Sequence, residues 1–396
     1  MPPISYEALL GVAVIAFVAP LLLGLLPWLR VPAVVLEIVV GIVVGPSVLG
    51  WIRVDLPIEV LSTLGLAFLL FLAGLEINFD QLRGRPLMLS AAGLVFSFVL
   101  ALVAGYATQA VGLVHSPLFL AIVLVATSLG LVLPVLNDAG LAVTRFGQLV
   151  IASASLADFG AVILLSLFFS REARSPFATA ALLVGFVLTI GLAGITLARA
   201  ERFSVLSILL RRLQDTTDQI RVRGAVLLLL AFAALAGPFG IELLLAAFMA
   251  GSVISLIDRD GQMTHPHFHS KLQAVGYGFL IPVFFVSSGL QFDLRSLLAS
   301  PAGLVKIPVF LAALLIVRAL PAVLYVRDFG GRRAAVAGLL QATSLPFIVA
   351  ATQIGLSLSL IQRSTAAALV AAGLLSVVAF PALALSLTTP PTRGDD

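Results

Sequence analysis

Residues 146–170 read FGQLVIASASLADFGAVILLSLFFS, an apolar run that contains one ionisable side chain, Asp158. Arg145 and Arg171 each lie thirteen residues from Asp158, so a continuous helix would place the carboxylate about 20 Å from either charged end. That is the middle of a bilayer, where a charge costs about 2.5–3.5 kcal/mol on insertion scales. Such a residue usually faces a cavity, carries a proton or binds an ion; the alternative is a buried hydrogen bond that holds helices together.

The composition places the whole chain among polytopic α-helical membrane proteins. Of its 396 residues, 61% are hydrophobic, 11% are charged and 33 are glycine. The net charge of +4 does not indicate nucleic acid as a partner, because the basic residues lie in short loops between apolar runs. The chain has no cysteine, which excludes disulfides and thiol chemistry.

About thirteen apolar segments are long enough to span a membrane or nearly span it. They are expected at residues 6–28, 32–50, 57–78, 86–112, 117–138, 146–170, 177–198, 224–239, 241–257, 272–291, 302–326, 334–356 and 364–388. The eighth and ninth are short and are separated only by residues 237–240. Because few residues lie outside the segments, we expect one membrane domain over residues 1–396, without a soluble regulatory domain.

The positive charges of the loops predict the orientation of the chain. Sixteen Lys and Arg residues lie on the side that includes the C-terminus, and five lie on the other side. This asymmetry predicts a multi-pass protein of the cell (inner) membrane with a cytoplasmic C-terminus. The longest linker, residues 201–223, alternates basic and apolar residues and is expected to form an amphipathic helix on the cytoplasmic surface.

A short internal repeat predicts an inverted architecture. Residues 126–129, Ala-Thr-Ser-Leu, recur at 342–345, and Gly-Leu-Glu at 74–76 is echoed by Gly-Leu-Gln at 289–291, at offsets of 216 and 215. The matching segments are seven apart, an odd number of crossings, so the two halves are expected to be inverted in the membrane. We place the first repeat at about 32–170, the linker at 171–240 and the second repeat at about 241–388. The inversion requires the short eighth and ninth segments to be two helices.

Both copies of Ala-Thr-Ser-Leu fall at the middle of their segments, next to residues that interrupt helices. Gly130 and Pro134 follow the first copy, and Pro346 follows the second directly. Glycine lowers helix propensity and proline removes a backbone donor. Paired interruptions at the midplane indicate a transport site made from two broken, crossing helices. The alternative is a pair of kinked helices packed through small residues.

Oxygen atoms from these interruptions and from the neighbouring helix are suited to a small cation. Thr127 and Ser128 belong to the first break, Thr343 and Ser344 to the second, and Asp158 comes from the sixth segment. Carbonyl, hydroxyl and carboxylate oxygens are the hard ligands that such cations prefer. The sequence therefore predicts a cation site around Asp158.

Five motifs in order along the chain resemble a known family. They are Arg30-Val31-Pro32 with Glu37, Gly41 and Gly45-Pro46; Leu70–Glu76; Ala126–Ser128; Ser153–Asp158; and Ala246–Gly251. Together they resemble the monovalent cation:proton antiporters of the second subfamily, the Kef/NapA-like group, over essentially the whole chain. The resemblance implies an NhaA/NapA-like inverted-repeat fold with a dimerisation domain and a mobile core domain, a homodimer, and exchange of Na⁺ or K⁺ for H⁺. It also implies that Asp158 takes cation and proton in turn, while Thr127 and Ser128 help line the site.

Two positions depart from the family pattern. The family usually has Asp, Asn or Gln immediately before the essential Asp, whereas this chain has Ala157. Arg318, near the middle of the eleventh segment, stands where electrogenic relatives place Lys. Because arginine does not release its proton at any relevant pH, we interpret Arg318 as a fixed counter-charge. With Asp158 alone titrating, we expect one proton to exchange for one cation, so that transport is electroneutral.

Glu37 and three histidines are further candidates for functional residues. Glu37 in the second segment is either a proton-accessible acid or a polar helix contact. His265, His267 and His269 share one expected cytoplasmic loop and could sense pH or bind a metal adventitiously. No nucleotide-binding or hydrolase motif is present, so we expect no cofactor, no resident metal and no enzyme activity. Two alternatives remain: a sodium-coupled organic-anion carrier of the bile-acid type with the same fold, and a membrane sensor that does not transport.

Overall fold

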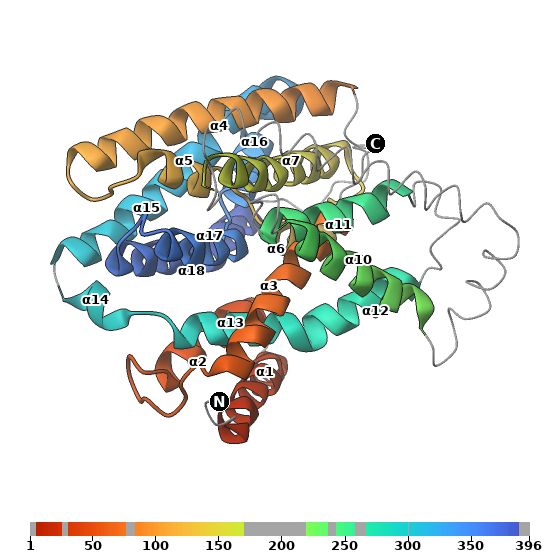
Figure 1. Ribbon diagram of the computed structural model, residues 1–396. Helices are drawn as coiled ribbons and strands as arrows, with labels where there is room; N and C mark the ends of the chain where they lie inside the picture. The colour runs from red at the N-terminus through yellow and green to blue at the C-terminus, as the bar shows by residue number, and fades with distance from the viewer. Residues whose placement is uncertain are drawn as a thin grey trace, which may run out of the picture. The chain divides into compact units, whose positions relative to one another are not determined.

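The computed structural model describes residues 5–25, 31–76, 84–169, 219–236, 243–257, 267–299 and 301–387. Every regular element in these ranges is helical (Figure 1). Eight stretches of the described chain are long and apolar enough to cross a membrane. The prediction of an all-α polytopic fold is confirmed.

The helices follow the apolar segments of the sequence closely. Their bounds are α1 Tyr6–Leu25, α2 Ala33–Val44, α3 Leu56–Leu75, α4 Gly84–Ala110, α5 Pro117–Val125, α6 Leu129–Asp138, α7 Arg145–Phe168, α10 Ile220–Ala236, α11 Leu243–Ile257, α12 His267–Val275, the π-helical turn η2 Gly276–Leu280, α13 Ile281–Leu290, α14 Leu294–Leu298, α15 Pro301–Ala319, the 3₁₀ turn η3 Leu320–Tyr325, α16 Val326–Gln341, α17 Pro346–Ser357 and α18 Arg363–Leu387.

Twelve of the thirteen predicted segments coincide with a helix or a broken helix of the structure. The seventh, residues 177–198, and most of the expected amphipathic linker lie outside the described residues. The uncertain eighth and ninth segments are two helices, because α10 ends at Ala236, α11 begins at Leu243, and the two pack against each other (Figure 1).

Two boundaries differ from the expectation for local backbone reasons. The second segment was expected to reach residue 50, but α2 ends at Val44 because Gly45 is extended and Pro46 follows it. The loop expected at 327–333 is reduced to a turn at Gly330 (φ 79°, ψ 163°), where the chain reverses so that Gly338 of α16 packs against Ala319 of α15. Helical residues lie directly on both sides of this turn, which glycine permits because it adopts positive φ readily, so the bounds of α16 include it.

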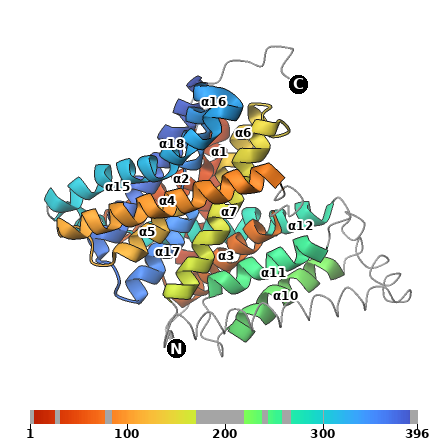
Figure 2. The same cartoon turned by 90° about the horizontal axis from the view of Figure 1, so that it is seen from above.

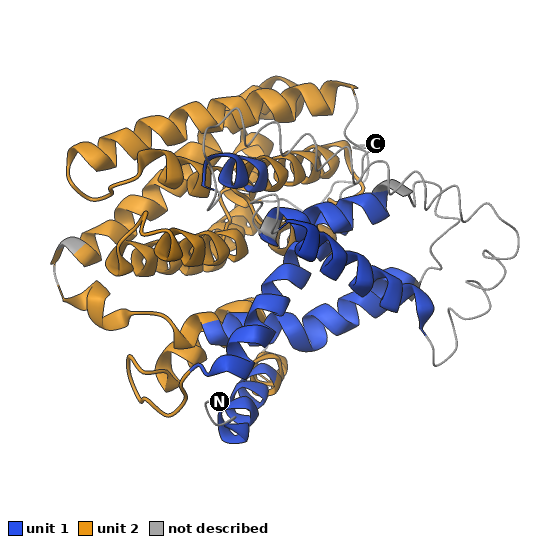
Figure 3. Cartoon of the chain, viewed as in Figure 1, with its two compact units in different colours: residues 1–16, 54–79, 162–287 blue, residues 17–53, 80–161, 288–396 orange. Residues whose placement is uncertain are grey.

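Two compact units alternate along the chain, one made of residues 1–16, 54–79 and 162–287 and the other of 17–53, 80–161 and 288–396 (Figure 3). In the first unit, α3 packs closely against α11. Gly74 and Gly251 allow this approach, because a Cβ atom at either position would collide with backbone atoms of the facing helix. Asp55 caps α3 by accepting a hydrogen bond from the Ile58 amide, 3.2 Å from Oδ1.

The second unit contains both copies of the Ala-Thr-Ser-Leu motif. In this unit α4 packs against α5 and α15, and α18 packs against α15, α16 and α17 (Figure 2). A buried apolar cluster joins α6, α7, η3, α16 and α18; its members are Val132, Leu136, Phe146, Leu149, Val150, Ala322, Tyr325, Ala334, Val336, Ala337, Leu340 and Ala384. These contacts hold the two broken helices between longer, continuous ones.

Candidate functional site

Both predicted breaks are present, and they meet. The first separates α5 from α6, with Ala126 and Ser128 in extended conformation; the second separates α16 from α17. The backbone N–H of Ser128 donates to the carbonyl of Thr343, with 3.0 Å between N and O. The Thr127 hydroxyl donates to the Gln341 carbonyl at 2.8 Å. The backbone groups freed in one helix are therefore partly satisfied by the other.

Asp158 lies on α7 with its carboxylate at the beginning of α6. Oδ1 accepts the Thr127 amide at 3.1 Å, and Oδ2 accepts the Leu129 amide at 3.2 Å. A helix N-terminus carries partial positive charge, so this is a favourable place for a carboxylate. Asp158 is half-buried, while the preceding Ala157 is fully buried. The structure thus brings Asp158 and Thr127 into direct contact.

Arg318 lies on α15 and contacts the C-terminal end of α16. Its guanidinium donates to the Thr127 hydroxyl from Nη2 and Nε, at 2.6 and 2.9 Å, and from Nε to the Gln341 carbonyl at 3.4 Å. Nη1 donates to the hydroxyl of Ser97 on α4, at 3.1 Å. Gln341 is the last residue of α16, where free carbonyls carry partial negative charge. Arg318 is only 2% exposed, so these hydrogen bonds replace its hydration.

A buried chain of polar side chains supports this arrangement from one side. The hydroxyl groups of Ser90 and Ser153 lie 2.8 Å apart, and Ser153 lies 3.0 Å from the Tyr325 hydroxyl. The Gln341 amide Nε2 donates to the same Tyr325 oxygen at 3.4 Å. None of these residues, nor Ser97, was predicted as part of the site. Ser153 begins one of the family motifs, and the others were marked only by a polar side chain within an apolar segment.

The second break is held mainly through its backbone. The Ser344 amide donates to the hydroxyl of Ser376 on α18, at 3.2 Å. The Thr343 hydroxyl donates to Leu339 O at 3.3 Å. Ser344 is fully buried, and its own hydroxyl has no hydrogen-bond partner among the described residues.

The remaining candidates lie elsewhere. Glu37 is buried in α2 and makes no hydrogen bond or ion pair with another described residue. His265 lies outside the described residues. His267 and His269 were expected in the same loop, and this expectation is wrong, because both lie in the first turn of α12. Within the described part of the chain, no three His, Cys, Asp or Glu residues are grouped so as to hold a metal ion.

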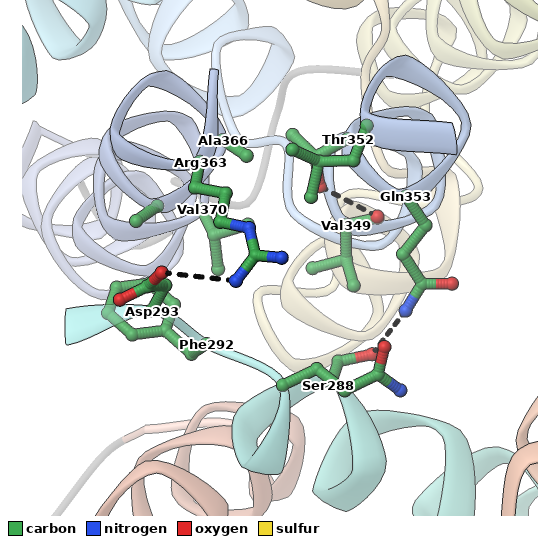
Figure 4. Close-up of a pocket in the computed structure, with 12 residues that line it drawn as sticks. Ser288, Phe292, Asp293, Val349, Thr352, Gln353, Arg363, Ala366 and Val370 are labelled. Atoms are coloured by element: carbon green, nitrogen blue, oxygen red, sulfur yellow. Dashed lines mark hydrogen bonds and ion pairs between the residues drawn. The ribbon is translucent and has the colours of Figure 1, made fainter. Parts of the chain in front are cut away.

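A separate cavity of about 400 Å³ is bounded by residues of α13, α17 and α18 and by the segment that leads into α14 (Figure 4). Arg363 faces Asp293 across it with 3.9 Å between Nη1 and Oδ2, and Gln353 donates to the Ser288 hydroxyl at 3.3 Å. Partial burial acts to raise the pKa of Asp293, but hydrogen bonds from Ser296 and the charges of Arg363 and Arg295 outweigh it and lower the pKa. We call the two breaks at residues 126–128 and 342–345, together with Asp158 and Arg318, the crossing. None of the residues that line the cavity belongs to it.

Taken together, the crossing offers a carboxylate, hydroxyls and backbone oxygens around two helix ends of opposite partial charge. A carboxylate accepts either a proton or a small cation, and oxygen ligands suit cations such as Na⁺. A fixed arginine can neutralise charge there but cannot carry a proton. Such a set of groups can hold either a cation or a proton.

The chain is similar to several proteins that are named as antiporters. The Bacillus subtilis (strain 168) putative Na(+)/H(+) antiporter YjbQ is 29% identical over 392 residues; the match covers 95% of this chain and 62% of YjbQ, so this chain spans about three fifths of that protein. The Na(+)/H(+)-K(+) antiporter GerN of Bacillus cereus is 30% identical over 266 residues, covering 66% of this chain and 65% of GerN.

The structure of the sodium proton antiporter MjNhaP1 from Methanocaldococcus jannaschii matches with a TM-score of 0.65 and 17% identity, over 96% of this chain and 97% of that one, and thus shows the same fold. The model of the family described as "sodium/hydrogen exchanger, transmembrane" matches residues 13–385 of this chain. These findings do not favour the organic-anion carrier or the sensor. The chain therefore belongs to the transmembrane sodium/hydrogen exchanger family.

Proposed function

We propose that this protein is a secondary antiporter that exchanges Na⁺ or K⁺ for H⁺ across the membrane. The observation that carries the proposal is the position of the Asp158 carboxylate, at the amide end of α6 where the two broken helices meet. Membership of the family supports it, and so do the relatives that are named Na(+)/H(+) and Na(+)/H(+)-K(+) antiporters.

Asp158 binds the proton and the cation in turn. A carboxylate removed from water is costly as an isolated charge, so it is neutralised either by a proton or by a cation. The Thr127 and Ser128 oxygens lie on the same break and are the proposed neighbouring ligands, with Thr343 and Ser344 from the second break. Cation binding therefore releases the proton, and this competition couples the two fluxes.

Arg318 acts as the counter-charge of the site and is not a ligand. Its donors bind Thr127, Ser97 and Gln341, so it fixes the first break while balancing the carboxylate and the carbonyl end of α16. Since it stays charged throughout, Asp158 is the only group of the crossing that titrates in the cycle. Exchange is then one proton for one monovalent cation and carries no net charge.

The wider organisation is part of the proposal. The protein works by alternating access of a core domain that carries Asp158, as a homodimer in the cell (inner) membrane with a cytoplasmic C-terminus. The asymmetry of Lys and Arg in the loops supports the orientation. The repeated Ala-Thr-Ser-Leu breaks support the assignment of two repeats, at about 32–170 and 241–388.

The direct test of the function is proton movement in proteoliposomes loaded with a pH-sensitive dye. Adding Na⁺, K⁺ or Li⁺ outside vesicles with an acidic lumen should make the lumen alkaline, and the order of the salts gives the selectivity. Protein-free liposomes are the control. A purified, monodisperse protein that moves protons with none of the cations would contradict the proposal.

A further inference from the structure

Ser376, on α18, binds the backbone of the second break. Its hydroxyl accepts the Ser344 amide at 3.2 Å and lies 3.1 Å from the Ser344 carbonyl and 2.7 Å from the Gly373 carbonyl. A hydroxyl has one proton, so it accepts from the amide while donating to one of the two carbonyls at a time. Ser376 is fully buried, as is Ser344.

This contact is similar in place to the one that Asp158 makes in the first half of the chain, although it reaches a neighbouring amide of the break. There, α7 follows the half-helix α6 and returns Asp158 to the amides of Thr127 and Leu129. Here, α18 follows the half-helix α17 and returns Ser376 to the amide of Ser344. Asp158 and Ser376 are 218 positions apart in the sequence, close to the offset of 216 between the two breaks.

The packing of α18 makes the contact possible. A Cβ atom at Gly373 would lie 3.0 Å from the Ser344 carbonyl oxygen and 3.2 Å from a Leu345 methyl group, so glycine lets α18 approach the break more closely than a larger residue would. Serine one turn later then reaches both the amide and the carbonyl of Ser344. The α17 helix has no side-chain cap of its own, and Pro346 supplies no amide in its first turn.

We infer that Ser376 is the neutral counterpart of Asp158 and a positioning residue for ion binding. It holds the second break, in which the hydroxyl of Ser344 is fully buried and makes no hydrogen bond to any described residue. That oxygen is an acceptor in place for a water molecule or the transported cation. The inference rests on the proposed function, because it assigns to Ser376 the geometry of the same cation site.

The test compares Ser376→Ala and Ser376→Thr with the native protein, and uses Ser386→Ala as the matched control. Ser386 also lies on α18, but its hydroxyl only donates to Leu383 of the same helix near the surface. The first readout is hydrogen–deuterium exchange of the Ser344 amide, which needs no transport. The second is the apparent KM for the cation against the maximal rate in proteoliposomes.

Ser376→Ala should speed exchange of the Ser344 amide and raise the apparent KM roughly 3- to 10-fold, the loss expected for one buried hydrogen bond, while the maximal rate changes less. Ser376→Thr should restore both values, and Ser386→Ala should match the native protein. If Ser376→Ala is not monodisperse, Ser376→Cys keeps the shape of the side chain with a slightly larger atom and a weaker hydrogen bond, and the same shifts are expected.

Native amide exchange and native KM in a well-folded Ser376→Ala or Ser376→Cys protein would overturn the inference while leaving the antiporter intact. A native protein without any cation-dependent proton movement would instead overturn the proposed function. In that case the amide exchange alone still decides whether Ser376 holds the second break.

Discussion

At the scale of single residues, the two charges of the crossing are placed at helix ends of opposite polarity. Asp158 accepts amides at the start of α6, and Arg318 donates to the carbonyl of Gln341 at the end of α16. Thr127 connects them, because its amide binds Asp158 while its hydroxyl binds Arg318. A substitution at any of the three should therefore change the hydrogen bonds of the other two.

Arg318→Lys tests whether the planar guanidinium is needed. Lysine keeps the charge but cannot donate at once to Thr127, Ser97 and Gln341, so we expect the free energy of unfolding to fall by about 2–3 kcal/mol. Thermal melting in detergent measures the loss. Arg327→Lys at an exposed position is the control and should melt like the native protein. Equal melting temperatures of the native protein, Arg318→Lys and Arg327→Lys would show that the guanidinium of Arg318 is dispensable for stability.

The sequence predicted Asp158, Thr127 and Arg318 because charged or helix-breaking residues are conspicuous within apolar segments. Their assignment to ion binding stays a prediction. Ser97, Tyr325 and Ser376 could not be identified, because a hydroxyl inside an apolar helix looks the same whether it bonds its own backbone or a neighbouring helix. The contact between Ser128 and Thr343 also required the three-dimensional fold, since 215 residues separate the two.

At the scale of the helices, the breaks were predictable and one close helix contact was not. Thr and Ser followed by Gly130 and Pro134 marked the first interruption, and Thr and Ser followed by Pro346 marked the second. The boundary between α15 and α16 was also predictable, because Arg327, Arg332 and Arg333 marked it and the chain turns among them at Gly330. The close contact of α3 with α11 was not expected, because small residues at 74 and 251 have no periodic signature of their own.

Gly251→Ala tests that contact. A Cβ atom at 251 would collide with the Phe71 carbonyl, so we expect the protein to lose about 1–3 kcal/mol of stability, as overpacked interiors do. Gly224→Ala is the matched control, because it lies in α10 with open space around it and alanine favours a helix. Thermal melts of the two variants should move in opposite directions. A Gly251→Ala protein at least as stable as Gly224→Ala would rule out the close approach.

Asp293 provides a prediction about pH. Its folded-state pKa is lowered, so the stability it contributes is present above the ordinary carboxyl pKa and is lost as the pH falls through the lowered value. Asp293→Asn removes the charge next to Arg363 and weakens the cap of α14. We expect a small loss at neutral pH, about 1 kcal/mol or less, that vanishes in acid. Melting curves of both proteins from neutral pH to below the ordinary carboxyl range test it; a constant difference would contradict it.

At the scale of the whole molecule, composition was sufficient to predict an all-helical polytopic chain, and the resemblance of five motifs was needed to predict its family. The two compact units draw on separate parts of the sequence, so their membership could not be read from sequence order. The dimer, the movement of a core domain and the orientation remain predictions, because each concerns partners or states that a single chain does not contain.

Electroneutral exchange is the prediction that belongs to this scale. If Asp158 alone titrates, the rate should not change when a K⁺ gradient with valinomycin sets the membrane potential, with Na⁺ as the transported ion. A protonophore control shows that the potential is established. A rate that follows the potential would mean that another group of the chain carries charge during the cycle.

The measurement that tests the central claim most directly is cation-dependent proton movement by Asp158→Asn in proteoliposomes. Asparagine retains an oxygen that can accept an amide but cannot take up the proton, so we predict a folded protein with no exchange for Na⁺, K⁺ or Li⁺. Asp328→Asn, which removes a carboxylate bound to Arg85 outside the crossing, should exchange like the native chain. Exchange retained by Asp158→Asn would contradict the account and place the coupling site elsewhere.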